Sequence, residues 1–266
     1  MEKLTDMKER EDMLNSIIER MARRQEISVV GFADLSTYEN DLAAFGGDIV
    51  RGYPYGISIG IALSKDIVDG LRDRNNPNNA SLYHFHAYEI INSRLDLATS
   101  LMSSFLQRKG YRALPTPAAE RTDLENAIPT VSHKMVAHIA GLGWIGKNCL
   151  LITPEYGPRI RLSSILTSAP LLAANNPVEQ RCNTCRACVE ICPATGIKGR
   201  NYEFGEAREE RFDFRKCQNY FEELKKDTSK KSVCGMCLYI CPFGKDLDIS
   251  VHDTVAPPVQ SHIPKG

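Results

Sequence analysis

Hydrophobic and polar residues recur with different periods along the first two-thirds of the chain, and the changes of period predict its helices and strands. Apolar side chains return every three or four residues over 7–24 and 82–109, which is the spacing of helices with one buried face. Short apolar runs over 27–35, 55–63 and 159–167 are typical of strands. The apolar side of the long helix is expected to comprise Tyr88, Ile91, Leu95, Leu97, Leu101, Phe105 and Leu106.

The segments between these elements complete a domain in which helices and strands follow one another. Residues 72–80 are polar and predict a loop, and 111–114 predict a short extended segment before two prolines. A second, shorter helix is expected over 132–140 and a further strand over 149–153. This order of elements predicts an α/β domain over 1–175.

Composition narrows the class of protein. Lys and Arg number 33 and Asp and Glu number 33, so the formal net charge is zero and gives no overall attraction to nucleic acid or to an anionic membrane. The first 24 residues are charged throughout, unlike a signal peptide, and the chain has no run of about 18 apolar residues. We therefore expect a cytoplasmic protein without a membrane segment.

The cysteines supply the candidate chemistry. Residues 182–193 read C-x2-C-x2-C-x3-C-P, the run in which two-cluster bacterial ferredoxins use the fourth Cys for the other cluster. A second run at 234–242 has Lys231 where a symmetric pattern would have a Cys, and Cys217 is the unassigned cysteine nearby. Crossed ligation then predicts two [4Fe-4S] clusters: cluster 1 on Cys182, Cys185, Cys188 and Cys241, and cluster 2 on Cys192, Cys217, Cys234 and Cys237.

Other uses of these cysteines agree less well with their spacing. Disulfides are rare in proteins without a secretory signal, and a zinc ribbon has no use for the third Cys or for the Cys-Pro ending. The ninth cysteine, Cys149, is expected to be a small core residue. We therefore predict a ferredoxin-like domain over 176–250, followed by an extended tail over 251–266.

A glycine-rich turn precedes the cluster domain. Gly141, Gly143 and Gly146 match a dinucleotide fingerprint as letters, and with Lys147 they come within one residue of a phosphate-binding loop. The context argues against both, because a helix precedes the turn, a strand follows it, and Asn148 replaces the Ser or Thr that holds magnesium. Trp144 in this turn is expected to be exposed, beside Lys147.

These motifs together resemble the epoxyqueuosine reductase family, which comprises corrinoid-dependent iron–sulfur enzymes related to the reductive dehalogenases. The resemblance rests on the turn at 140–147, the segments 150–157 and 165–167, and the asymmetric two-cluster module. It implies a corrinoid-binding type of mixed α/β domain, with cobalamin held between it and the cluster domain. The expected corrinoid contacts are Gly141, Gly143, Trp144, Gly146, Lys147, Leu151 and Leu162.

The resemblance also implies a proton donor, and here the sequence departs from the family. The family has an Asp after the long helix, whereas 112–117 contains none, so Asp123 or Glu125 is expected to replace it. His133 and Lys134 fall where the family has an acid-and-base pair, which makes Lys134 a third candidate. The family's longer members continue into repeats that help to hold tRNA, so a tRNA substrate is left open.

Three functions follow from this reading. The first is a corrinoid-dependent reductase that takes electrons from a ferredoxin- or flavodoxin-type donor and reduces an electrophilic small molecule or modified nucleoside. The second is an electron carrier that reduces a partner protein and has no small substrate of its own. The third is a flavin-binding domain supplied with electrons by the clusters. The site, and not the fold, decides between them.

Overall fold

The fold is described from a computed structural model, which covers residues 2–73, 76–121, 123, 128–173, 175–226 and 232–245, with side chains from residue 10 onward. The predicted tail over 251–266 and the candidate Glu125 lie outside the described residues. None of the helices in these ranges is long and apolar enough to cross a membrane.

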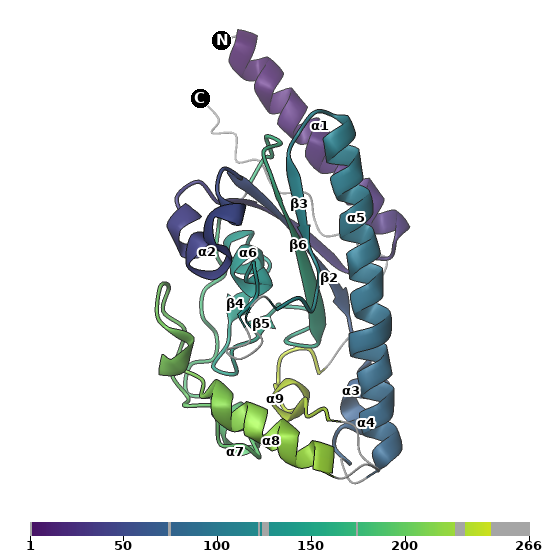
Figure 1. Ribbon diagram of the computed structural model, residues 1–266, viewed down its shortest axis with the longest axis vertical. Coiled ribbons are helices and arrows are strands. Elements are labelled where there is room, and N and C mark those ends of the chain that lie inside the picture. Colours follow the sequence, from purple (N-terminus) through teal and green to yellow (C-terminus); the bar gives the residue numbers. More distant parts are fainter. Residues whose placement is uncertain are drawn as a thin grey trace, which may run out of the picture.

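An antiparallel sheet of four strands forms the centre of the α/β domain (Figure 1). Its order is β1 (Val29–Asp34), β2 (Tyr55–Ala62), β6 (Ile160–Thr167) and β3 (Ala113–Thr116). The predictions of strands over 27–35, 55–63 and 159–167 are confirmed. The predicted extended segment continues through Pro115, which is tolerated because β3 is an edge strand.

The strand predicted over 149–153 is mostly wrong. Only Leu151–Ile152 (β5) is extended, and it pairs with Trp144–Ile145 (β4) inside the glycine-rich turn. Cys149 has a φ of 60°, a left-handed conformation that interrupts a strand. The turn is therefore a small hairpin that projects from the sheet.

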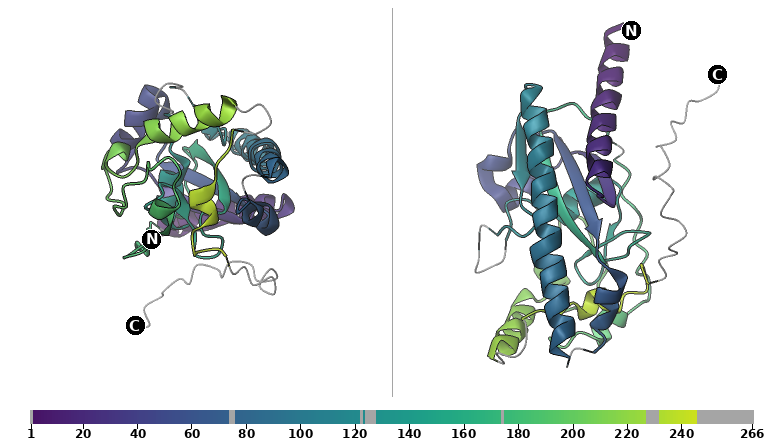
Figure 2. Two further views of the ribbon diagram at one scale, coloured as in Figure 1. Left: turned by 90° about the horizontal axis from the view of Figure 1, so that it is seen from below. Right: turned by 90° about the vertical axis from the view of Figure 1, so that its right-hand side faces the viewer.

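Helices cover both faces of the sheet (Figure 2). On one face, α1 (Glu2–Arg24) and α5 (Asn92–Arg108) bury Leu14, Ile18 and Leu95 against the central strands. On the other, α2 (Glu39–Gly46), a 3-10 turn η1 (Gly47–Val50) and α6 (His133–Ile139) enclose a second cluster around Leu42 and Val136. The predicted helices over 7–24 and 132–140 are confirmed.

The long helix is one continuous rod made of three parts. It comprises α4 (Pro77–His84), a π-helical segment η2 (Phe85–Ile91) and α5. The side chain of Asn76 accepts a hydrogen bond from the Asn78 amide, so the helix begins inside the segment predicted to be a loop.

The predicted apolar side of this helix is partly wrong, because Leu97 and Leu101 are 59% and 46% exposed. The buried positions repeat every three or four residues and include small side chains that hydrophobicity alone does not reveal. Among them are Ala87, Ile91, Leu95, Ala98, Met102 and Leu106.

This pattern supplies a matched pair of variants on one helix. Leu95 is fully buried, so Leu95→Ala is expected to lower the free energy of unfolding by about 2–5 kcal/mol. Leu97→Ala removes the same atoms from an exposed position, and its effect is expected to stay within about 0.5 kcal/mol. Urea unfolding of the cluster-loaded protein measures both, and equal losses would contradict the assigned face.

The C-terminal part lies at one end of the sheet and consists of short helices joined by loops (Figure 1). It contains α7 (Ala187–Glu190), the 3-10 turn η3 (Arg208–Glu210), α8 (Phe214–Lys226) and α9 (Met236–Tyr239). In the α/β domain, α3 (Lys65–Gly70) faces this end and contacts α9.

Candidate metal centres

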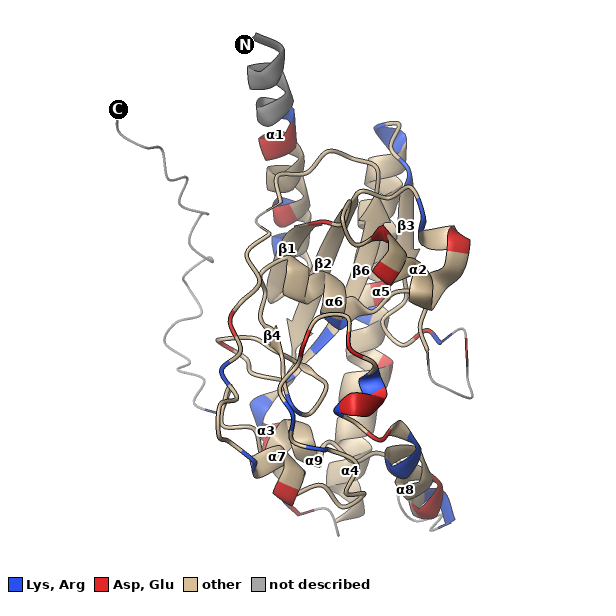
Figure 3. Cartoon of the chain, turned by 90° about the vertical axis from the view of Figure 1, so that its left-hand side faces the viewer, with Lys and Arg blue, Asp and Glu red and all other residues tan. Residues whose placement is uncertain are grey.

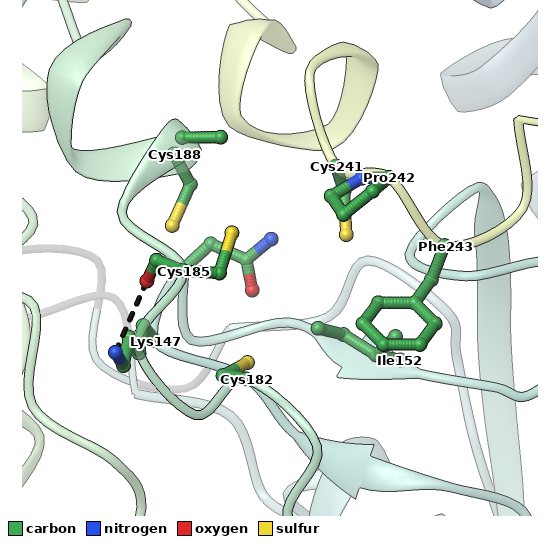
Figure 4. A pocket seen from close by; sticks show the side chains of 10 residues that line it. Lys147, Ile152, Cys182, Cys185, Cys188, Cys241, Pro242 and Phe243 are labelled. Carbon is green, nitrogen blue, oxygen red and sulfur yellow. Dashed lines mark hydrogen bonds between the residues drawn. The ribbon is translucent and has the colours of Figure 1, made fainter.

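Four cysteines from two distant segments line one pocket. Figure 4 shows the sulfur atoms of Cys182, Cys185, Cys188 and Cys241 around a common space. Cys182 and Cys185 come from the loop that leads into α7, Cys188 stands on α7, and Cys241 follows α9. The remaining lining residues are Lys147, Asn148, Ile152, Ala187, Pro242 and Phe243.

A second group of thiols lies next to the first. Cys217 stands on α8 and Cys237 on α9, and each interacts electrostatically with Cys192 and Cys234. Cys237 also interacts with Cys188 of the first group, so the two groups are neighbours. The groups have the membership that crossed ligation predicts, while the ligand assignment itself remains a prediction.

The thiols are partly buried and close together, so a thiolate at these positions needs a positive centre to compensate its charge. Burial, and after it the neighbouring thiols, raise the pKa of Cys188 and of Cys217 to about 11. Burial likewise raises the pKa of Cys241 to about 12. Iron binds the thiolate and compensates its charge, so these buried thiol sets fit [4Fe-4S] clusters. Within the described ranges, no three His, Cys, Asp or Glu side chains are placed to hold a single metal ion.

The glycine-rich hairpin holds both thiol loops. Lys147, 6% exposed, donates hydrogen bonds from Nζ to the carbonyl oxygens of Asn183 at 2.6 Å and Cys185 at 3.0 Å. The next residue, Asn148, donates from Nδ2 to the carbonyl oxygen of Cys237 at 3.2 Å. Two adjacent side chains therefore connect the α/β domain to one loop of each thiol set.

A close backbone contact fixes the segment that follows Cys241. A Cβ atom added to Gly157 would lie 2.0 Å from the Phe243 carbonyl oxygen, and one added to Gly244 would lie 2.1 Å from that of Tyr156. Both glycines have positive φ, so the contact needs glycine for space and for conformation. The turn before β6 thus positions the Cys-Pro segment.

The residues expected to contact a corrinoid are mostly engaged elsewhere. Trp144 is 1% exposed and packs with Cys182 and Cys241, so the expectation that it is exposed is wrong. Ile152 closes over Gly143 and Gly146. Leu151 is buried, and Lys147 is bonded to the cluster loop. Of the seven expected contacts, only Gly141 and Leu162 are partly accessible to solvent. The packed residues do not fit as direct contacts of a large planar ring.

The candidate proton donors occupy different environments. Lys134 on α6 is half-buried and donates a hydrogen bond to the Cys149 carbonyl oxygen at 2.9 Å. Burial lowers the pKa of Lys134, the Cys149 thiol raises it, and positive Arg211 lowers it again. Asp123 forms an isolated β-bridge with Ile128.

His133, beside Lys134, is held between two segments. Its Nδ1 lies 3.0 Å from the Ser164 hydroxyl and its Nε2 lies 3.0 Å from the Pro117 carbonyl oxygen. Burial lowers its pKa, so a neutral imidazole is favoured.

One buried arginine was not expected from the sequence. Arg211 is 3% exposed, forms an ion pair with Glu206, and donates from Nη1 to the Cys149 sulfur at 3.4 Å. Cys149 is buried, so the prediction of a core residue is confirmed, and its thiol accepts a hydrogen bond from a cation. The spacing between Arg211 and the turn is too long for a local motif to reveal this contact.

The fold and the two thiol sets define a class: an α/β domain that carries a double iron–sulfur module. The model of the 4Fe-4S double cluster binding domain matches residues 181–244. Epoxyqueuosine reductase of Bacillus anthracis is 30% identical over 136 residues, which are 48% of this chain and 33% of that protein. Tetrachloroethene reductive dehalogenase of Sulfurospirillum multivorans is 28% identical over 175 residues, 61% of this chain and 31% of that protein.

Solved structures show the same fold. Epoxyqueuosine reductase from Bacillus subtilis superposes with a TM-score of 0.59 at 17% identity, covering 90% of this chain and 68% of that one. A reductive dehalogenase described with B12-dependent dehalogenation gives a TM-score of 0.64 at 22% identity, covering 88% and 32%. The predicted resemblance to the epoxyqueuosine reductase family and the predicted fold class are confirmed. The chain spans about a third of the length of the curated relatives it matches.

Proposed function

We propose that this protein is an iron–sulfur reductase, in which two [4Fe-4S] clusters pass electrons to an acceptor bound on the α/β domain. The observation that carries the proposal is the hairpin at Lys147 and Asn148, which holds a loop of each thiol set. An electron delivered to either cluster therefore reaches the α/β domain through a short, packed contact. A low-potential donor of the ferredoxin or flavodoxin type would supply the electrons.

The likeness to the relatives makes a corrinoid the candidate acceptor. When bound, it would supply a strongly reducing metal centre, and the protein would position it and exclude water. Of the expected contacts, Gly141 and Leu162 are the ones left to bind it. Substrates of the relatives suggest an electrophilic small molecule or a modified nucleoside, and a tRNA stem loop carrying epoxyqueuosine is one probe, since an epoxyqueuosine reductase has been solved with it.

Lys134 is the proposed proton donor. A lysine whose pKa is lowered by burial releases its proton more readily near neutral pH than an exposed lysine does. Asp123 remains the alternative from the segment before α6, and the proposal for Glu125 rests on the sequence alone.

An anaerobic EPR titration of the reconstituted protein with cob(II)alamin tests the corrinoid proposal. The expected result is a base-off cobalt signal that saturates at about one corrinoid per chain and disappears when a low-potential reductant also reduces the clusters. Free, base-on cobalamin beside two reducible clusters would refute the corrinoid proposal and leave the iron–sulfur module standing.

The electron carrier is the second candidate, and one observation favours it. Trp144 and Lys147 are both buried and packed on the cluster 1 loop. The hairpin therefore contacts the cluster loop with the side chains that a small ligand would need. A carrier would reduce a partner protein and bind no cobalamin. A third reading, flavin on the α/β domain, predicts a flavin absorption spectrum in the purified protein.

A further inference from the structure

We propose that the glycine-rich hairpin raises the reduction potential of cluster 1 through the charge of Lys147 and the indole N–H of Trp144, and so makes cluster 1 the site from which electrons leave. The inference rests on the proposed electron-transfer function. It concerns a property of the clusters that can be measured without any substrate or acceptor.

The first observation is a buried cation without a carboxylate partner. Lys147 lines the pocket of the cluster 1 thiols, and its ammonium group is bonded to two carbonyl oxygens. No Asp or Glu pairs with it in the part of the chain that the structure describes. An isolated buried charge is costly, and an anionic cluster held by four thiolates would compensate it.

The second observation is a buried donor without an acceptor. Trp144 is almost fully buried, yet its Nε1 has no hydrogen-bond partner among the described residues. The ring packs with Cys182 and Cys241 and meets Phe243 edge to face at 4.8 Å. Trp144 does not itself line the pocket, but its ring packs on two of the four cluster 1 cysteines, so we infer that a sulfur of cluster 1 is the acceptor of this N–H group.

Both groups act in the same direction. Reduction adds one negative charge to a cluster, so a fixed positive charge or an N–H donor nearby stabilises the reduced state more than the oxidised state. Lys147 and Trp144 come from one rigid hairpin that contacts the cluster 1 pocket. Cluster 1 should therefore accept the electron from cluster 2 and hold it beside the α/β domain.

EPR-monitored redox titration of four variants tests this. Lys147→Gln keeps a donor to the carbonyl oxygens but removes the charge, and Lys147→Arg keeps the charge. We expect Lys147→Gln to lower the reduction equilibrium constant of cluster 1 at least tenfold, about 59 mV for one electron. The reduction potential of cluster 2 should not change in Lys147→Gln. In Lys147→Arg the potentials of both clusters should equal those of the wild type. Lys198→Gln, which removes an exposed lysine of the cluster domain, is the control and should shift neither cluster.

Trp144→Phe should lower the same potential by less, because it removes an N–H group and no charge. Iron content separates an electrostatic role from a mechanical one. If Lys147→Gln loses cluster 1 while Lys147→Arg keeps it, Trp144→Phe decides: a lowered potential of cluster 1 supports the proposal and an unchanged potential overturns it. If both lose it, or if both keep it at the wild-type potential, Lys147 is a mechanical anchor and the proposal is overturned. A protein that binds no acceptor would refute the proposed function and leave these potentials untouched.

Discussion

A Cys241→Ala variant is expected to lose the cluster built on the first cysteine run, although Cys241 belongs to the second. Its sulfur shares a pocket with those of Cys182, Cys185 and Cys188. Iron content should fall from about eight to about four atoms per chain, and one of the two EPR signals should disappear. Cys192→Ala should remove the other cluster by the same reasoning.

Double variants distinguish crossed from uncrossed ligation. Cys182→Ala combined with Cys241→Ala should lose no more iron than Cys241→Ala alone, because both residues serve one cluster. Cys192→Ala combined with Cys241→Ala should lose nearly all of it. Uncrossed ligation predicts that both double variants lose all of their iron. The decisive result is therefore that the variant with Cys182→Ala and Cys241→Ala keeps half of its iron. Cys149→Ala removes the remaining cysteine and should keep both clusters.

The grouping of the cysteines into two neighbouring sets could be predicted from the sequence because it follows from their spacing. Three thiols separated by two residues can face one cluster, and a proline after the fourth turns it away. The substitute Cys217 was found by elimination, and the structure brings it to Cys192 and Cys234 from α8. The grouping of the cysteines does not depend on side-chain periodicity. Errors in the predicted helix and strand boundaries therefore do not affect it.

The environment of the hairpin could not be predicted in the same way. Trp144 and Lys147 are types of residue that usually reach solvent, and only the packing of a loop some 35 residues further on buries them. The sequence showed three glycines and an unexplained cation. It could not show that Lys147 and Asn148 bond to different thiol loops, because that depends on tertiary contacts.

The positions of the important charged side chains could not be predicted from the amino-acid composition either. A neutral chain gave no overall electrostatic signal, and Figure 3 shows positive and negative residues side by side on α8. Cations with structural consequences are buried, as is Arg211; two others are Lys147 beside the first thiol set, and Arg159, which pairs with Asp69 and donates to the Tyr239 carbonyl oxygen. Burial strengthens each of these interactions, so a few buried charges matter more than the net charge.

Lys134→Met is expected to abolish most substrate reduction while leaving the clusters reducible. General acid catalysis contributes about 10²- to 10⁴-fold, and kcat should fall by a factor in that range if Lys134 gives the proton. The assay follows reduction of the epoxyqueuosine-bearing stem loop or another electrophile that the wild-type protein accepts. Lys109→Met changes an exposed lysine of the α/β domain in the same way and should leave kcat unchanged.

The pH dependence of stability tests the environment of Lys134 without a substrate. Its pKa is lowered in the folded protein, mainly by burial, so the unfolded chain binds a proton more readily between that lowered pKa and the ordinary value of 10.5. The wild-type free energy of unfolding therefore gains a contribution as pH rises through this window, and below it the buried charge is a constant cost. Lys134→Met removes the charge, so the variant should be at least as stable as the wild type at neutral pH, with the difference shrinking toward pH 10. A variant that is less stable at every pH, with kcat intact, would show that Lys134 only anchors the Cys149 carbonyl oxygen.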